Sequence, residues 1–307
     1  MANFTKDGNQ PSTQEYLCTI GLGVHQKIFL ITTTIPIAIV TFLGNVLIIL
    51  ALKKVTSLRP PSKVLLGCLA ATDVGVGLVT SPLRMGYIMS PEHSKRCHYF
   101  KHLYETIGAI FCAVSVFILT AISVDRLLAL VLGLKYKQVV ALRRVWFLVV
   151  TIWILSTCLA FLEVYNFRIV INVAYIVPLL CIATSTFCYM KIYLTLRHHQ
   201  SQVQGHVQQR QQDEGVIPLY IARYRKTVSN ALWIQMTLLA CYVPYTIVTA
   251  TVAITRSNSK ALGLLWSVII SLLLINSLLN PFLYCWKMRE VRQGVKDTIR
   301  RLGWLSS

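Results

Sequence analysis

The stretch Asn276-Ser-Leu-Leu-Asn280-Pro281-Phe-Leu-Tyr284 lies near the end of a segment, Ala261 to Trp286, that contains no charged residue. At about 1.5 Å per residue, a helix of this length spans the bilayer core of about 30 Å. Inside lipid, every polar group needs a partner within the protein. Pro281 removes a backbone N–H and bends the helix, so the freed carbonyl and the two Asn amides need partners on other helices. The stretch therefore predicts a bent membrane helix with polar partners across a helix bundle.

The composition of the chain is that of a membrane protein. Of its 307 residues, 55% are hydrophobic and only 13% are charged, and the mean hydropathy is +0.60. Soluble domains carry about 25% charged residues. The net charge of +19 would fit a nucleic-acid partner, but the positive residues lie in short patches between apolar runs, so no nucleic acid is expected. Met1 to Tyr16 is polar and lacks the pattern of a cleavable signal peptide, so the first apolar run is expected to act as the insertion signal.

Seven apolar runs predict an all-α, seven-transmembrane helix bundle. The boundary between the fourth and fifth runs is the least distinct. Residues 1–27 are expected to form an N-terminal segment, 28–286 the bundle with a flexible Gln-rich loop at about 198–215, and 287–307 an amphipathic helix and short tail. The runs centre on Ile28–Leu52, Val64–Leu83, Thr106–Val124, Val145–Leu162, Ile169–Met190, Thr227–Ile254 and Ala261–Trp286.

The distribution of Lys and Arg predicts the orientation in the membrane. Four groups of basic residues fall on one side of the predicted bundle and hold most of the 30 Lys and Arg. That side is expected to be cytosolic, which places the N-terminus outside the cell, and the bundle is expected in the plasma membrane. Asn3 in Asn3-Phe-Thr5 is then a candidate glycan acceptor on the correct side, although a single motif of this length is common by chance.

Polar and charged residues within the apolar runs mark candidate functional positions. Asp73 follows Leu69-Ala-Ala-Thr in the second run, and a carboxylate at this depth is costly unless it has a function. The alternative is a neutral, structural Asp. Asp125 and Arg126 end the third run, where they either reach neighbouring helices and a cytosolic partner or form an ordinary charge pair at the membrane edge.

The ordered set of motifs resembles the rhodopsin-like (class A) G-protein-coupled receptors across the whole membrane region. Each motif is weak alone, and the order makes the set specific. Within that family the chain is similar to the broad group near the adenosine and melanocortin receptors. The motifs are Gly44-Asn45, Leu69-Ala-Ala-Thr-Asp73, Asp125-Arg126-Leu127, Trp153, Pro244 and Asn280-Pro281-Phe-Leu-Tyr284.

The resemblance implies a receptor that couples an extracellular ligand to a heterotrimeric G protein, without a cofactor other than an allosteric sodium ion. Arg126, next to Asp125, matches the arginine that contacts the G protein, and Pro244 matches the hinge of the sixth helix. Tyr189 and Tyr284 match tyrosines that move toward the arginine in the active state. The residues matching the family's sodium site, which offer one carboxylate and neutral oxygens to a hard cation, are Asp73, Ser115, Asn276 and Asn280.

The amphipathic helix expected after the seventh run also agrees with the resemblance. Apolar residues recur every three or four positions between Lys287 and Trp304, and six basic residues fill the other face. Such a helix lies on the inner leaflet. The recurring apolar residues are Val291, Val295, Ile299 and Leu302.

Departures from the family pattern identify positions where behaviour is expected to differ. Leu127 replaces the usual Tyr, and Tyr242 replaces the usual Trp of the sixth-helix kink. Tyr224 occupies the position where many receptors carry an acid that holds the arginine, so basal activity is expected to be raised. Pro178 lies eleven residues before Tyr189, whereas the family proline lies eight before, so the fifth helix is expected to be straighter.

Nine cysteines are present, and two of them, Cys18 and Cys97, are expected outside the cell, where disulfides persist. The family normally joins the third helix to the second outer loop, but here that loop, around Glu163 to Ile169, is short and contains no cysteine. A Cys18–Cys97 disulfide is therefore proposed, with Cys158 as a weaker partner and free thiols as the alternative. The remaining cysteines are expected to be small apolar residues: Cys68, Cys112, Cys181, Cys188, Cys241 and Cys285.

The ligand is expected to be a small molecule or a peptide, and the resemblance supports neither a biogenic amine held by the usual salt bridge nor retinal. Gly108 stands where amine receptors place an Asp, and Leu274 stands where opsins place the retinal lysine. Arg84 and Glu105 are expected to pair with each other, to bind a zwitterionic or peptide ligand, or simply to face water. The residues expected to line the outer pocket are Arg84, Tyr104, Glu105, Cys112, Tyr242, Tyr245, Thr249 and Trp266.

A membrane transporter or channel built around Asp73 is the alternative function. Such proteins usually show internal repeats and paired broken helices, and the sequence shows neither. An enzyme is not expected, because no His-Glu-x-x-His or Gly-x-Ser-x-Gly signature is present and the seven His are scattered.

Overall fold

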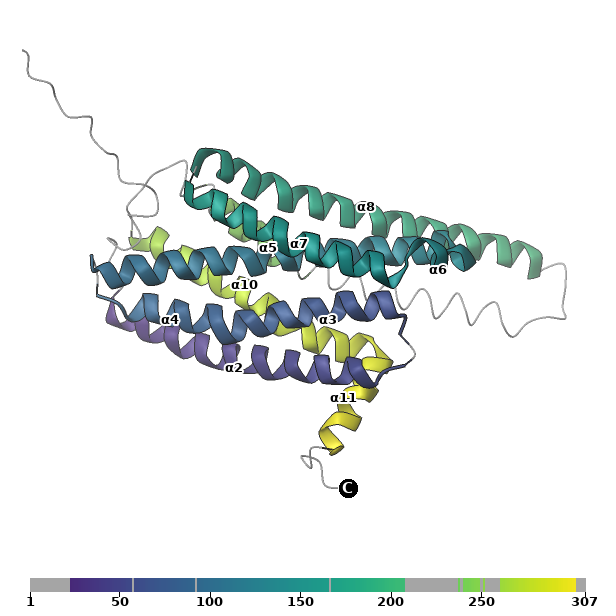
Figure 1. The fold of residues 1–307 in the computed structure, drawn as a ribbon, viewed down its shortest axis with the longest axis horizontal. Coiled ribbons are helices and arrows are strands. Elements are labelled where there is room, and N and C mark those ends of the chain that lie inside the picture. Colours follow the sequence, from purple (N-terminus) through teal and green to yellow (C-terminus); the bar gives the residue numbers. More distant parts are fainter. Residues whose placement is uncertain are drawn as a thin grey trace, which may run out of the picture.

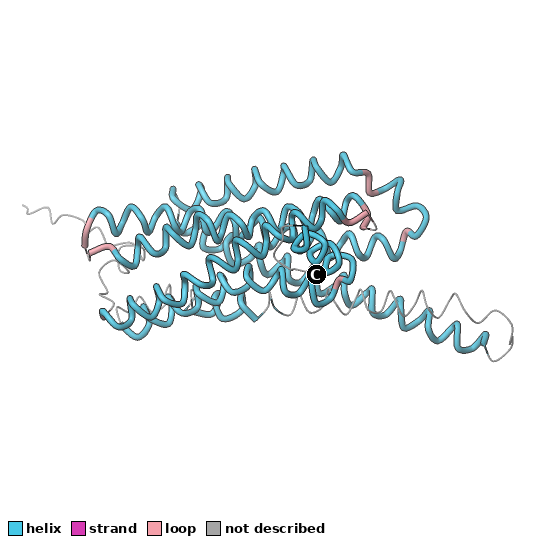
Figure 2. Tube along the Cα trace, turned by 90° about the horizontal axis from the view of Figure 1, so that it is seen from below, coloured by secondary structure: helices cyan, strands magenta, loops and turns pink. Residues whose placement is uncertain are grey.

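The structure, a computed structural model, is helical throughout the part of the chain that it describes. It describes residues 23–56, 58–91, 93–165, 167–207, 237, 240–248, 251 and 260–301, and these residues form no strand (Figure 2). The helices are α2 (Val24–Lys54), α3 (Pro60–Gly75), the π-helical η1 (Val76–Thr80), α4 (Ser81–Met89), α5 (Lys95–Val131), η2 (Gly133–Lys135), α6 (Tyr136–Val139), α7 (Leu142–Tyr165), α8 (Phe167–Val207), α10 (Lys260–Lys287) and α11 (Arg289–Arg301).

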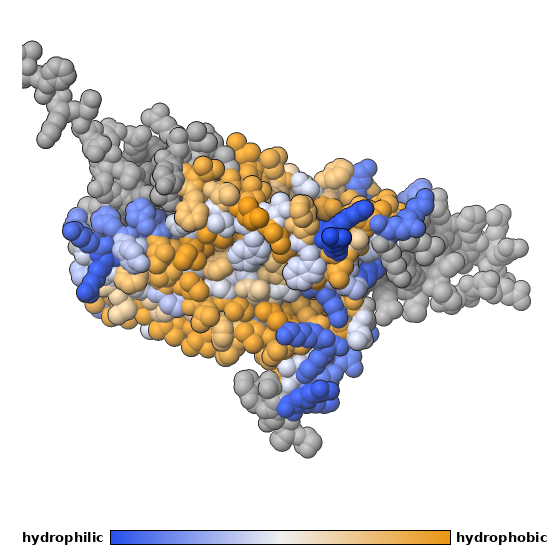
Figure 3. Space-filling view, viewed as in Figure 1, coloured by the Kyte–Doolittle hydropathy of each residue, from blue (hydrophilic) through white to orange (hydrophobic). Residues whose placement is uncertain are grey.

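The long helices lie side by side in one elongated bundle (Figure 1). Within the described residues, six helical segments are long and apolar enough to cross a membrane. The sixth predicted run, Thr227–Ile254, lies largely outside the described residues, although 240–248 are helical. On the face seen in Figure 3, a broad apolar belt covers the middle of the bundle, and hydrophilic residues gather at its ends. Exposed residues of this belt include Phe29, Leu43, Phe147, Ile154, Leu180, Phe187 and Phe282.

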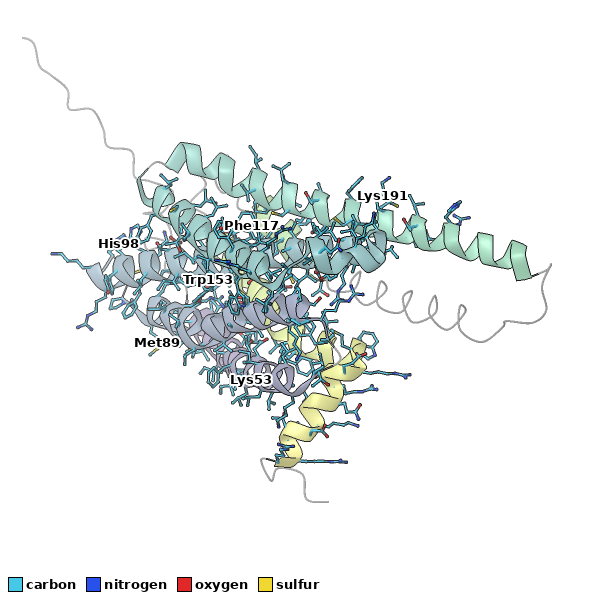
Figure 4. All side chains as sticks on the ribbon, turned by 45° about the vertical axis from the view of Figure 1, so that its right-hand side comes forward. Lys53, Met89, His98, Phe117, Trp153 and Lys191 are labelled. Carbon is cyan, nitrogen blue, oxygen red and sulfur yellow. The ribbon has the colours of Figure 1, made fainter. Side chains whose placement is uncertain are left out.

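The bundle has two distinct ends. At one end, here called the Cys97 end, α2, α5 and α10 begin and α4 finishes; the other end carries α11 (Figure 1). His98 lies at the Cys97 end, whereas Lys53 and Lys191 lie toward the α11 end (Figure 4). Trp153 and Phe117 lie between them, within the body of the bundle.

Two expected loops are shorter than the sequence suggested. α8 continues to Val207, so the first half of the loop expected to be flexible at 198–215 is helical. α7 ends at Tyr165 and α8 begins at Phe167, which leaves almost nothing of the loop expected around 163–169. The extension of α8 beyond its apolar run is rich in Gln and, apart from Gly205, contains no strong helix breaker, so the helix continues.

The second membrane segment is continuous but changes its winding just after Asp73. Pro82 cannot donate a backbone hydrogen bond and its ring crowds the preceding turn. The five-residue π segment η1 precedes it, and the Ser81 hydroxyl donates to the carbonyl of Val76 at 3.0 Å. Local π winding often marks functional positions, and here it separates Asp73 on α3 from Arg84 on α4.

The bend at Pro281 has the partners that the sequence required. Pro281 cannot bond to the carbonyl four residues earlier, at Ser277. The Asn45 side-chain amide on α2 donates to this carbonyl at 3.2 Å and to the Thr41 carbonyl at 2.9 Å. A Cβ added at Gly44 would meet the Pro281 ring at 3.1 Å, so glycine allows α2 to approach the bend closely. The sequence required a partner on another helix for the freed carbonyl of Ser277, and Asn45 on α2 is that partner.

The amphipathic helix after the seventh run is α11, which turns away from the bundle axis and packs against α2 (Figure 1). Val291 is almost fully buried, and Val295 packs against the same core. The basic side chains Arg289, Arg292, Lys296, Arg300 and Arg301 are exposed. Leu302 lies outside the described residues.

Replacing Gly294 by leucine is expected to loosen α11 from α2. A Cβ at this position would lie 2.9 Å from Val55 Cγ2 and 3.1 Å from the Ala51 carbonyl oxygen, so a larger side chain forces the helices apart. Overpacking of this kind costs about 1–3 kcal/mol. Thermal unfolding of the detergent-purified protein measures the effect. Gln293→Leu, on the exposed face of the same helix, is the control, and equal melting temperatures for the two variants would contradict this packing.

Candidate functional site

The centre of the bundle contains a buried carboxylate that is only half satisfied. Asp73 on α3 has an exposed fraction of 0%, and its Oδ2 accepts a hydrogen bond of 2.8 Å from the Asn280 amide on α10. Within the described part of the chain, Asp73 Oδ1 has no hydrogen-bond partner. An unsatisfied carboxylate oxygen in a buried site is unfavourable, so this position favours a donor or a cation.

Polar groups around Asp73 form what we call the central polar cluster: Asn45, Thr72, Asp73, Ser115, Asn276 and Asn280. Ser115 lies 3.2 Å from the Thr72 hydroxyl, so the structure brings it to the residue before Asp73 rather than to the carboxylate itself. Asn276 is buried one turn before Asn280, and no hydrogen bond of its side chain occurs within the described residues. Asn45 Oδ1 is a second buried oxygen without a partner there. One carboxylate and several neutral oxygens suit a hard cation with oxygen ligands, and these residues fit a sodium ion.

At the α11 end, Asp125 is held by two hydrogen bonds from other segments. Ser62 at the start of α3 donates to Asp125 Oδ2 at 2.8 Å, and the Tyr136 hydroxyl donates to Asp125 Oδ1. Burial, followed by the bond to Asp125, raises the pKa of Tyr136 to about 12, although Arg59 and Arg126 oppose the shift. Tyr136 therefore stays protonated at neutral pH and remains a donor. Its bond to Asp125 joins α6 to α5, and the bond from Ser62 joins α3 to α5.

The switch residues predicted near Arg126 are only partly assembled. Tyr189 on α8 is buried, and its hydroxyl accepts a hydrogen bond of 3.0 Å from Ser123, one turn before Leu127 on α5. The Tyr284 hydroxyl on α10 is buried and has no hydrogen-bond partner within the described ranges. Tyr189 and Tyr284 thus do not bond to each other within the described residues.

Aromatic side chains dominate the predicted outer pocket. Tyr104 stacks on Tyr87 with ring centroids 6.4 Å apart, and Tyr245 lies 5.9 Å from Trp266. Tyr242, at the position where the family has Trp, lies with its hydroxyl 2.7 Å from Cys112 Sγ. A tryptophan has no hydroxyl for this contact, which joins α5 directly to the sixth membrane segment. Thr249 lies outside the described residues.

Arg84 and Glu105 were expected to pair with each other, to bind a zwitterionic or peptide ligand, or to face water. No ion pair joins the two residues, and Arg84 does not face water. The Arg84 guanidinium is 2% exposed and donates to Thr34, Ser267 and Ser271 on α2 and α10. Glu105 lies 3.8 Å from Lys101 Nζ, one turn earlier on α5. Arg84 thus bonds to neutral acceptors, whereas Glu105 lies beside a lysine.

The structure answers part of the question of which cysteines form a disulfide bond. Cys97 takes part in a disulfide bond, and Cys158, the weaker partner considered, is a free thiol. Cys18 and Asn3 lie outside the described residues, so the Cys18–Cys97 pairing and the glycan at Asn3 stay predictions. The other cysteines within the described residues are free: Cys68, Cys112, Cys181, Cys188, Cys241 and Cys285.

Several residues of the site gave no recognisable signal in the sequence. Ser62 and Tyr136 bind Asp125 from a helix start and a loop helix, where hydrophobic periodicity says nothing about side-chain direction. Thr34 and Ser271 bind Arg84 but are ordinary small polar residues of membrane helices. The conflict between Pro281 and a buried Ser277 carbonyl was the one signal that pointed to an acceptor in need of a partner.

Comparison with known proteins gives a consistent result. Residues 44–172 and 163–284 match the family described as "7 transmembrane receptor (rhodopsin family)". The histamine H2 receptor of Rattus norvegicus is 31% identical over 148 residues, which cover 48% of this chain and 40% of that receptor. The adenosine receptor A3 of Ovis aries is 24% identical over 292 residues, which cover 86% of this chain and 87% of that receptor. The comparisons do not favour a transporter or channel.

Proposed function

Because the chain belongs to the rhodopsin family of seven-transmembrane receptors, we propose that it resides in the plasma membrane and activates a heterotrimeric G protein when an extracellular small molecule or peptide binds. Family membership makes the chain a receptor rather than an enzyme, with seven membrane helices. The match across residues 44–284, which contains every switch motif, is the observation that carries the proposal.

The proposed orientation places the N-terminus and the Cys97 end outside the cell. Basic residues concentrated at the α11 end support this orientation, since cytosolic loops carry an excess of Lys and Arg. The exposed basic residues there include Lys53, Lys54, Arg59, Arg143, Arg144, Lys191 and Arg197, besides those of α11.

We propose that the central polar cluster holds a sodium ion in the inactive state. Asp73, Ser115, Asn276 and Asn280 would hold the ion, which supplies the positive charge that Asp73 Oδ1 lacks. The Asp73–Asn280 bond joins α3 to α10 just before the bend at Pro281. Occupation of the cluster therefore stabilises one position of α10, and loss of it permits another.

We propose that activation rearranges the α11 end of the bundle. An agonist at the Cys97 end favours the state in which the sixth segment, hinged at Pro244, moves outward and exposes Arg126 to the G protein. Tyr189 then leaves Ser123, and Tyr284 gains the hydroxyl partner that it lacks in the described structure. Both tyrosines approach Arg126 in this state.

Expression of the receptor without any ligand is expected to raise G-protein signalling above mock cells. Tyr224 occupies the position where an acid would hold Arg126, so the inactive state lacks one stabilising ion pair. A loss of about 1 kcal/mol shifts a two-state population about fivefold. The measurement is a panel of G-protein dissociation sensors at matched surface expression, with Tyr224→Glu as the variant expected to lower the signal. A signal equal to that of mock cells for every G protein would contradict the expectation.

A further inference from the structure

The Arg84 guanidinium is a buried positive charge in the outer part of the bundle. Arg84 lies on α4, three helical turns beyond Asp73, and only 2% of its surface is exposed. Its Nη1 donates to Thr34 Oγ1 at 3.2 Å, and its Nη2 donates to the Ser267 carbonyl at 2.7 Å and to Ser271 Oγ at 2.8 Å. The side chain therefore connects α2, α4 and α10.

All of these partners are neutral, so the charge itself is not compensated. Arg84 makes no ion pair within the described part of the chain. Glu105, the acid expected closest to it, lies beside Lys101 instead. A buried charge without an opposite charge is costly, and arginines inside membranes are usually paired or lie on a substrate path. The neutral acceptors orient the guanidinium, while its five donors exceed the three hydrogen bonds that it makes.

The surroundings of Arg84 favour an anion over a second cation. Exposed Lys95 and Arg96 begin α5 at the Cys97 end, and the buried Lys101, which lies 3.8 Å from Glu105, follows five residues after Arg96. Tyr87, one helical turn after Arg84 on α4, stacks on Tyr104 of α5. Positive charge around an entrance attracts anions, and aromatic rings accept an apolar body.

We propose that Arg84 binds the carboxylate of the ligand, and that the ligand is an organic acid with an apolar body that packs against the Tyr87–Tyr104 pair. This inference rests on the receptor function proposed above and specifies its ligand class. The planar guanidinium suits a carboxylate because two parallel N–H groups match its two oxygens. A carboxylate that competes for Nη2 weakens its bonds to Ser267 and Ser271, and so connects the ligand to α10, the helix that carries Asn280 and Pro281.

A purely structural role for Arg84, joining three helices, is the competing explanation. In that case neutral and acidic ligands would bind alike, and Arg84 would affect stability only. The two explanations differ in their response to an internal carboxylate. Ser271→Asp places a carboxylate where Arg84 Nη2 already has an acceptor at 2.8 Å. The variant is therefore expected to fold, and its new carboxylate is expected to pair with the guanidinium and block ligand binding there.

The test measures the melting temperature of the purified full-length receptor with decanoate, phenylpropionate and indole-3-acetate, each beside its methyl ester. We expect at least one acid, and not its ester, to stabilise the wild type and the control Arg143→Gln, which removes an exposed arginine from the opposite end of the bundle. Affinity for that acid should fall about 100-fold in Ser271→Asp and in Arg84→Gln, and at least 10-fold in Arg84→Lys, as expected when a charge-assisted bidentate bond is lost.

The proposal is overturned if no acid stabilises the wild type, if acid and ester act equally, or if the acid binds Ser271→Asp as tightly as the wild type. Folding of Arg84→Gln is not required, because Ser271→Asp and Arg84→Lys decide the result without it. Binding is measured without a G protein, so failure here leaves the receptor function standing. Conversely, acid binding in a receptor that activates no G protein would reject the signalling proposal alone.

Discussion

Replacing Arg126 by alanine is expected to abolish G-protein activation while leaving the receptor at the cell surface. In the proposed active state Arg126 supplies a charged contact to the G protein that no neighbouring side chain can replace. Loss of one partner of a buried, hydrogen-bonded charge contact costs about 3 kcal/mol, or roughly 100-fold in coupling. Asp125 keeps its bonds from Ser62 and Tyr136, so the α11 end is expected to remain folded.

The measurement is G-protein dissociation, both ligand-independent and agonist-stimulated, normalised to surface receptor. Arg96→Ala is the matched control, because it removes an exposed arginine from the opposite end of the bundle. It should leave ligand-independent signalling unchanged. Normal signalling by Arg126→Ala at normal surface expression would argue strongly against the receptor mechanism proposed here.

Replacing Asp73 by asparagine is expected to remove the effect of sodium on stability. Asp73 Oδ1 is a buried carboxylate oxygen without a partner in the described residues, so a bound cation should stabilise the folded protein. At a sodium concentration of roughly ten times Kd, binding contributes about 1.4 kcal/mol. The melting temperature of the wild type should therefore rise in sodium chloride relative to equimolar N-methylglucamine chloride. The melting temperature of Asp73→Asn should be the same in both salts. Without sodium, this variant should be no less stable than the wild type.

Ser156→Ala is the control for the sodium experiment. Ser156 on α7 is also buried with an unpartnered polar atom in the described structure, but it lies outside the central polar cluster. This variant should keep the full sodium effect. Asn280→Ala, which removes the hydrogen bond that the Asn280 amide donates to Asp73, should reduce sodium binding without eliminating the carboxylate. A sodium effect that persists in Asp73→Asn would show that the ion binds elsewhere or acts nonspecifically.

Much of the candidate site could be predicted because membrane burial makes each polar residue conspicuous. Asp73, Asn276, Asn280 and Pro281 stand out in apolar runs, and the Asp73–Asn280 bond joins two of the residues selected in this way. The Arg84–Glu105 relationship could not be predicted. Both residues fall near a membrane edge, where a small rotation of either helix changes the surroundings of its side chain. Each side chain can then face water, contact the other residue or contact a third residue. The π segment before Pro82 supplies such a rotation.

The membrane class, the order of the helices and the residues that need polar partners can all be predicted from the amino-acid sequence. Each of these depends on local properties of the chain, because an apolar run must be long enough to cross lipid and a proline within a helix frees a backbone carbonyl. The partner that each polar residue takes is known only from the folded bundle: Asn45 for the carbonyl freed by Pro281, and three neutral acceptors for Arg84. Such pairings depend on how helices distant in the chain rotate and approach one another, and no local pattern specifies that geometry.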